Sequence, residues 1–323
     1  MKSFTLGIVL KKVLAIILLI ITFVSFFPAL NNGFVDWDDE ANFVENENYR
    51  GFSWKNVKWM FTTFHLGHYQ PLSWLTFAVD YTLWDMNPLG YHLTNLIIHL
   101  ANTVFLFLLI IKFLYLALDK IDSRKIEIFS CIGTLFFSIH PLRVESVAWI
   151  TERRDVLSGL FFLLSIISYL NIYNNEKCKN FYYFLSLTFF SFSLLSKAWA
   201  ITIAFVLFAL DIYFFKYHKN LKKSLIQKIP FLLLGSIFGF IAAIAQINAD
   251  AAYSIEKRGI LARFAQSMYG LFFYFYKTIF PLELMPVYEF GKGLNPFELK
   301  YIICAIFITS LTLVLFIFRK RYP

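Results

Sequence analysis

Charged residues are scarce in this sequence. Only 16% of its 323 residues are charged, whereas 59% are hydrophobic and 20% are aromatic. A soluble domain of this length cannot bury so much apolar surface, so the long uncharged runs predict an all-α membrane protein with several spans. Cysteine is also rare. Cys131 and Cys304 lie in apolar segments and Cys178 in a basic loop, which favours neither a disulfide framework nor a zinc site.

Two other patterns are missing. The sequence has no glycine-rich phosphate loop, so nothing in it points to a nucleotide. It also has no repeat of about 34 residues, the period of common helical repeat arrays. The net charge of +9 does not indicate nucleic acid, because most of the charges lie in short loops between apolar runs.

The apolar runs predict about eight spans with both termini in the cytoplasm. Lys2, Lys11 and Lys12 precede the first run and place the N-terminus inside. No small-residue cleavage site follows this run, so we expect an uncleaved first helix. The expected spans are residues 13–30, 91–116, 126–139, 156–173, 181–196, 198–215, 229–247 and 301–318.

Two long outer loops follow from this topology within a single domain of residues 1–323. The first, residues 31–90, carries short amphipathic helices near residues 54–64 and 72–84 that we expect to lie in the membrane interface. The last is residues 248–300. Within it, residues 262–280 are expected to form a re-entrant or interfacial helix, since a crossing there would leave the basic residues 319–321 outside. Nine spans remain the alternative.

The first outer loop opens with a dense group of acids. Asp36, Asp38, Asp39 and Glu40 lie within five residues. Like charges at this spacing repel, so a site that retains them usually needs a carboxylate. A solvated acidic loop is the plainer interpretation.

A polar stripe runs along the second expected span. His92, Asn95, His99 and Asn102 follow the spacing i, i+3, i+7, i+10 and share one helical face. In a membrane such a face points into the bundle or a wet cavity. Histidines two turns apart chelate a metal poorly, so a structural or cavity-lining role is favoured over a metal site.

The unusual polar groups converge on the outer side under this topology. They are the acid group, residues 140–145, Arg153, Lys197 and, by the same reasoning, Arg258 and Arg263. Carboxylates beside several cations and apolar grooves suit a substrate with a phosphate and a lipid tail. A carboxylate that is kept apart from those cations can act as a general base. Polyprenyl-phosphate sugars fit this description. Lys197 alone could equally reach membrane headgroups.

Several separated motifs, in order along nearly the whole chain, resemble the transmembrane and TPR-containing O-mannosyltransferases, and still more closely their bacterial relatives. They are Trp37-Asp38-Asp39 with Asn46; Tyr69-Gln70-Pro71-Leu72; residues 87–95 with His99; residues 137–141 with Glu145, Arg153 and Asp155-Val156-Leu157; Leu195-Ser196-Lys197 with Asp211; and residues 277–281.

The resemblance implies a GT-C fold and transfer of a sugar, mannose in the animal members, from a lipid phosphate to a Ser/Thr hydroxyl with inversion. Asp38 would then be the general base, and Asp39 would orient the acceptor or tune Asp38. The donor phosphate would be held by Arg153, Lys197 and His140, in a pocket shaped by Glu145, Arg143, His92 and Tyr69. We expect no metal, although the acids could hold Mg²⁺ or Mn²⁺.

Three departures from the family leave the acceptor and the sugar open. Ala198 stands where animal members often have Glu, Gln70 where they often have Arg, and no TPR array follows. A separate TPR-containing partner could capture a protein or glycan acceptor. The alternatives to an enzyme are a carrier or flippase for lipid-linked sugars and an inactive truncated paralogue. The frequent use of Lys, Asn, Ile and Phe suggests an AT-rich bacterial genome. We therefore expect the protein in a bacterial inner membrane.

Overall fold

The computed structural model describes residues 2–118, 121–174, 176–213, 221–249, 259–285, 288 and 294–318. Every regular element in these ranges is a helix, which confirms the prediction of an all-α polytopic membrane protein. The chain divides into two compact units, Met1–Ala249 and Asp250–Pro323, and each is described by itself. Arg258 and residues 319–321, which entered the predicted topology, lie outside the described residues.

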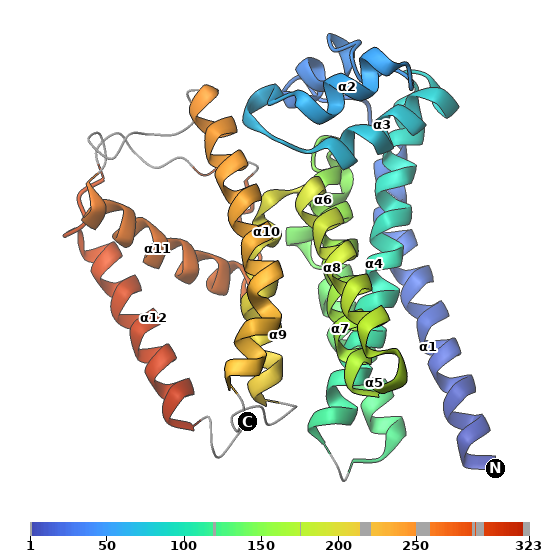
Figure 1. Cartoon of the computed structure of the whole chain (residues 1–323), viewed down its shortest axis with the longest axis vertical. Helices are drawn as coiled ribbons and strands as arrows, with labels where there is room; N and C mark the ends of the chain where they lie inside the picture. The colour runs from blue at the N-terminus through green and yellow to red at the C-terminus, as the bar shows by residue number, and fades with distance from the viewer. Residues whose placement is uncertain are drawn as a thin grey trace. The chain divides into compact units, whose positions relative to one another are not determined.

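The first unit is a helical bundle capped at one end by short helices (Figure 1). The bundle helices are α1 (Lys2–Phe26), α4 (Pro88–Ala117), α5 (Ser123–Ser138), α7 (Arg153–Asn174), α8 (Lys179–Ser196), α9 (Ile203–Tyr213) and α10 (Leu221–Asn248). The short elements are η1 (Phe27–Asn31), η2 (Glu40–Val44), α2 (Trp54–Thr62), η3 (His65–Gly67), α3 (Pro71–Trp84), η4 (Pro141–Arg143), α6 (Val144–Ala148), η5 (Glu176–Cys178) and η6 (Ala198–Thr202).

Fewer helices meet the criteria for a membrane span than the eight expected. Among the described residues five are long and apolar enough: 9–31, 88–117, 153–173, 224–248 and 299–318. A sixth arises if α5 and the segment Pro141–Ala148, bent by 56° at a short break, form one span. The other two expected spans, residues 181–196 and 198–215, correspond to α8 and to the short apolar segment Ala198–Tyr213.

Serine side chains hold α7 and α8 close together. Ser158 and Ser193 exchange hydroxyl-to-carbonyl hydrogen bonds (3.1 and 2.8 Å), and Ser165 and Ser186 repeat the pattern two turns along (2.8 and 2.9 Å). Small residues permit such close approach, and buried hydroxyls need these partners in a membrane. Because the two helices are joined through η5, the beginning of α7 and the end of α8 meet at the same end of the bundle.

The polar stripe of α4 has a structural role. His92, Asn95, His99 and Asn102 are all buried. Three of them bind main-chain groups of the segment that runs from the end of α5 to the beginning of α7, and so fix that segment against α4. The bonds run from Asn95 to the carbonyl oxygens of Val147 (3.4 Å) and Trp149 (3.2 Å), between His99 and that of Ser138 (2.8 Å), and from Asn102 to that of Val156 (2.8 Å).

A buried ion pair joins α9 and α10 beside the last turns of α7. The Asp211 carboxylate accepts from the Lys228 ammonium at 2.6 Å and from the hydroxyls of Tyr169 and Tyr173, both at 2.7 Å. All of its polar contacts are satisfied inside the protein, as charges in an apolar environment require.

The second unit contains α11 (Ile260–Ile279) and α12 (Leu299–Phe318). Aromatic rings join them, with centroids 5.7 Å apart for Tyr269 and Tyr301 and 5.2 Å for Phe272 and Phe307. The helix predicted at residues 262–280 is therefore present as α11, and it is not among the five apolar helices long enough to span a membrane. Its re-entrant or interfacial position stays a prediction.

Candidate functional site

The acidic motif after α1 is attached at two points to the segment before α7. The Trp37 ring stacks on that of Trp149, with centroids 5.6 Å apart. Asp39 is buried, and its carboxylate accepts hydrogen bonds from the main-chain N–H (3.1 Å) and the hydroxyl (2.6 Å) of Thr151. Burial raises the pKa of Asp39 above its usual value, and the hydrogen bond from Thr151 opposes the rise. Asp39 therefore anchors the loop.

Asp38 lies between these two anchors and differs from its neighbours. It is half-buried, whereas Asp36 and Glu40 are exposed. No described residue donates a hydrogen bond to Asp38 or forms an ion pair with it. The backbone at this position is thus fixed while the carboxylate remains open to a ligand, which is the arrangement that a general base needs.

The arginine predicted to bind phosphate is enclosed by protein. Arg153 has no exposed surface, and its guanidinium forms an ion pair with Asp80. Its Nε donates to Asn95 (2.7 Å), a second nitrogen donates to the Tyr91 carbonyl oxygen (2.8 Å), and its central carbon lies 4.2 Å from the Phe77 ring centroid. This arginine joins α3, α4 and α7. Its role in phosphate binding stays a prediction, and the geometry favours the next residue, Arg154.

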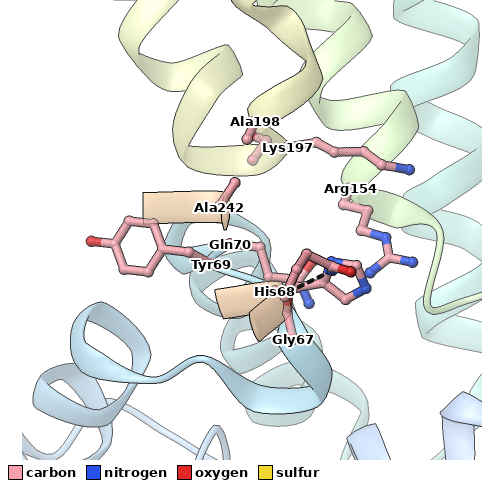
Figure 2. A pocket seen from close by; sticks show the side chains of 10 residues that line it. Gly67, His68, Tyr69, Gln70, Arg154, Lys197, Ala198 and Ala242 are labelled. Atoms are coloured by element: carbon pink, nitrogen blue, oxygen red, sulfur yellow. Dashed lines mark hydrogen bonds between the residues drawn. The ribbon is translucent and has the colours of Figure 1, made fainter. Parts of the chain in front are cut away.

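A pocket lies where η3, the end of α8 and α10 come together (Figure 2). Its cavity volume is about 50 Å³, and the space including the open mouth is about 310 Å³. The Arg154 and Lys197 side chains extend on the same side of the pocket, beside His68. The lining residues are Gly67, His68, Tyr69, Gln70, Arg154, Ser196, Lys197, Ala198, Ala242 and Gln246.

Glu152 connects the two cations of this pocket. One of its oxygens binds the Arg154 guanidinium, and the other accepts from the Lys197 ammonium at 3.0 Å. Lys197 also forms an ion pair with Asp155. Burial alone would raise the pKa of Glu152, but the hydrogen bond and charge of Arg154, together with the charge of Lys197, outweigh it and hold the pKa at about 2. Glu152 is therefore ionised at any physiological pH.

Adjacent residues link the acidic motif to the pocket. Thr151 binds Asp39, and the next residue, Glu152, binds both pocket cations. A single short segment thus positions an open carboxylate and a pair of cations.

The other residues predicted for the site lie around it. His140 is buried, and its Nδ1 accepts from the main-chain N–H two residues later at 3.2 Å, while Arg143 lies over an aromatic ring of α5 at 5.3 Å. Glu145 is exposed and His92 is buried in the bundle. Of the nine predicted site residues, the pocket lining includes Lys197 and Tyr69.

Sequence reasoning missed Arg154, His68 and Gln246 as pocket residues, and Glu152 as the residue that connects the two pocket cations. A signal existed for Arg154 and Glu152, since both belong to the charged run at the beginning of α7. Which arginine of this run faces the pocket depends on Asp80, the partner of Arg153. Gln246 could have been noticed as an amide near the end of an apolar helix, where its side chain now donates to the Gly67 carbonyl oxygen at 2.8 Å.

We expect Gly67→Ala to disturb the pocket. Gly67 has φ +76°, and a Cβ there would lie 2.9 Å from the Cβ of Ala249. The left-handed conformation alone costs an alanine about 1–2 kcal/mol. The variant should melt several degrees lower and bind a prenyl-phosphate probe more weakly, as thermal unfolding and calorimetry in detergent would measure. Gly33→Ala is the matched control, since nothing lies within 4 Å of its Cβ position. Equal behaviour of both variants would show that the contact between η3 and α10 is unimportant.

No protein-family model and no solved structure matches the chain. Curated proteins do match. The human protein O-mannosyl-transferase TMTC3 is 36% identical over 101 residues, which are 31% of this chain and 10% of that protein. The chain is similar to protein O-mannosyl-transferases.

Two further relatives extend the similarity. The mouse protein O-mannosyl-transferase TMTC4 is 28% identical over 207 residues, 57% of this chain and 28% of its own length. The fruit-fly protein O-mannosyl-transferase Tmtc1 is 31% identical over 157 residues, 46% of this chain and 17% of its own length. The chain thus spans less than a third of each relative. The resemblance seen in the motifs is confirmed over these regions, while the relation to bacterial members stays a prediction.

Proposed function

We propose that this protein is a membrane glycosyltransferase that moves a sugar, mannose or a close analogue, from a polyprenyl-phosphate donor to a hydroxyl acceptor. The observation that carries the proposal is the attachment of the Asp38 loop, through Asp39 and Thr151, to the segment whose Glu152 holds Arg154 and Lys197. The names of the relatives, protein O-mannosyl-transferases, support a mannosyl donor and a protein acceptor.

In the proposed reaction Asp38 takes the proton of the acceptor hydroxyl. The acceptor oxygen then forms a bond to the anomeric carbon while the bond from that carbon to the phosphate oxygen breaks, and the electron pair leaves with the phosphate. One displacement inverts the anomeric centre, because no second carboxylate is assigned as a nucleophile. Arg154 and Lys197 would stabilise the phosphate, whose charge grows as the bond breaks.

The proposed orientation follows the lysines in the first half of α1. They would place both termini in the cytoplasm and the acidic loop, with the pocket, on the outer side of a bacterial inner membrane. The prenyl tail of the donor would stay among the bundle helices. A separate partner carrying TPR repeats could present the acceptor.

The first test is mannosyl transfer in vitro. Purified protein in lipid nanodiscs would receive radiolabelled polyprenyl-phosphate mannose and a Ser/Thr-rich peptide, with EDTA in a parallel arm. We expect transfer that EDTA leaves unchanged. Removing a charged hydrogen-bond partner typically costs about 1.5–3 kcal/mol, so Arg154→Met and Lys197→Met should each weaken donor binding about ten- to hundredfold.

Lys55→Met is the matched control, because Lys55 is an exposed cation on α2 that does not line the pocket. It should bind and transfer as the wild type does. Donor binding without transfer to any acceptor would indicate a carrier instead of an enzyme. Absence of both would contradict the proposal, and inhibition by EDTA would overturn the metal-free mechanism.

A further inference from the structure

His68 is the histidine that lines this pocket, and its imidazole ring is available to a ligand. It is half-buried directly after η3, where Leu66 (φ 47°) and Gly67 (φ 76°) turn the chain. No described residue forms a hydrogen bond, an ion pair or a ring contact with the side chain of His68. His65 and His99 differ, since their rings contact main-chain carbonyl oxygens at 3.1 and 2.8 Å.

The surroundings of His68 keep it neutral while the pocket holds no ligand. Burial lowers its pKa to about 4, and the positive charges of Arg154 and Lys197 add to the effect, with Glu152 opposing it. The charged groups around the pocket are Arg154 and Asp155 at the beginning of α7, Glu152 just before it and Lys197 at the end of α8. On the remaining side, α10 contributes the uncharged Gln246.

The charges of this pocket are already balanced. Arg154 and Lys197 carry two positive charges, and the carboxylates of Glu152 and Asp155 that pair with them carry two negative ones. An entering phosphate therefore finds no unpaired cation. A neutral histidine among these groups is the lining residue that can become one, because an imidazole can take up a proton when a negative charge approaches it.

We propose that His68 binds the phosphate of the donor directly and takes up a proton when that phosphate enters the pocket. This inference rests on the proposed function and names a residue that supplies the missing positive charge. A unit negative charge about 4 Å away, at an effective dielectric constant near 20, would raise the pKa of an imidazole from about 4 to about 7.

Protonated His68 would also assist the chemical step. A phosphodiester carries one negative charge, and the prenyl phosphate that leaves carries a second one. The imidazolium would stabilise this added charge by a charge-assisted hydrogen bond. The proton from the acceptor goes separately to Asp38, so each proton has a defined donor and acceptor.

The test is the pH dependence of phosphodiester binding. Farnesyl methyl phosphate is a suitable probe, because its single acidic group stays ionised across the range and it contains no sugar. Glu152, with its pKa at about 2, does not titrate there either. The proton is bound more tightly in the complex, so affinity must fall as pH rises. We expect about a tenfold loss between pH 6 and pH 8, with uptake of up to one proton, measured by calorimetry in two buffers of different ionisation enthalpy.

His68→Gln should bind about tenfold more weakly than wild type at pH 6 and equally at pH 8, with no proton uptake. A purely structural role of His68 would weaken binding equally at both pH values. His65→Gln, in the same loop but outside the pocket lining, should keep the wild-type pH dependence. The alcohol farnesol, which lacks the phosphate, should show none.

Each outcome has a distinct meaning. If the wild type binds the phosphodiester equally at every pH, or if His68→Gln retains the wild-type pH dependence, the inference is wrong, while mannosyl transfer would leave the proposed function intact. If the wild type binds no phosphodiester at any pH, the anion site itself is refuted.

Discussion

Asp38→Asn should reduce sugar transfer by roughly two to four orders of magnitude, the usual contribution of a general base. Asparagine has nearly the same size as aspartate but cannot accept the acceptor proton. Asp38 has no hydrogen bond to a described residue, so its replacement breaks none of the contacts that hold the loop. Donor affinity and melting temperature should therefore stay near those of the wild type.

Two neighbouring acids provide the comparison. Asp36→Asn changes an exposed carboxylate and should leave transfer unaffected. Asp39→Asn should instead lower the melting temperature, because Asp39 accepts both hydrogen bonds from Thr151 and an amide cannot accept both with the same strength. Initial rates and calorimetric binding would be measured on all three variants. Equal loss of activity in Asp36→Asn and Asp38→Asn would remove Asp38 from the role of base.

Most helices could be predicted from the sequence because local signals determine them. The apolar run at residues 91–116 became α4, which begins at Pro88 with Asn87 as its cap, the Asn87 side chain accepting from the Leu89 N–H at 3.1 Å. The two short helices of the first outer loop are likewise present as α2 and α3. Hydrophobic period, proline and capping side chains act within a few residues, so they are visible without a fold.

The number of spans was harder to predict, because some helices of the bundle carry polar residues among their apolar ones. The helix α8 contains Ser186 and Ser193, whose hydroxyls bind main-chain carbonyl oxygens of α7, and these contacts exist only once α7 is placed beside it. The short break after α5 bends the chain by 56° at His140 and Pro141. A hydropathy pattern alone does not reveal such pairings.

For the candidate site, the types of residue could be predicted better than the contacts that these residues make. Asp38, Asp39 and Lys197 were identified from motifs, and their roles in the site stay predictions. Arg153 was chosen over Arg154 because the motif includes it, whereas the choice depends on Asp80, which lies on a different helix 73 residues earlier in the chain. Contacts between distant residues of this kind become visible only in three dimensions.

The Arg153–Asp80 pair yields the largest expected effect on stability. Asp80→Asn should lower the free energy of unfolding by about 3–5 kcal/mol, because it leaves a fully buried guanidinium without its counter-ion. Arginine cannot lose its proton to relieve this cost. Arg154→Met should be milder, since Glu152 retains Lys197 as a partner. Thermal and denaturant unfolding in one detergent would rank the variants.

Arg153→Met should differ from Asp80→Asn in its pH dependence. Burial raises the pKa of Asp80, and Arg153 now opposes that rise. Without the arginine the folded-state pKa of Asp80 rises further above its unfolded value, so the folded variant binds an extra proton and is more stable at pH 5 than at pH 8. The double variant Asp80→Leu with Arg153→Met, which buries no charge, should recover much of the lost stability. If both single variants melt like the wild type at every pH, the ion pair does not hold α3, α4 and α7 together, and Arg153 becomes free to serve the donor phosphate as its motif suggested.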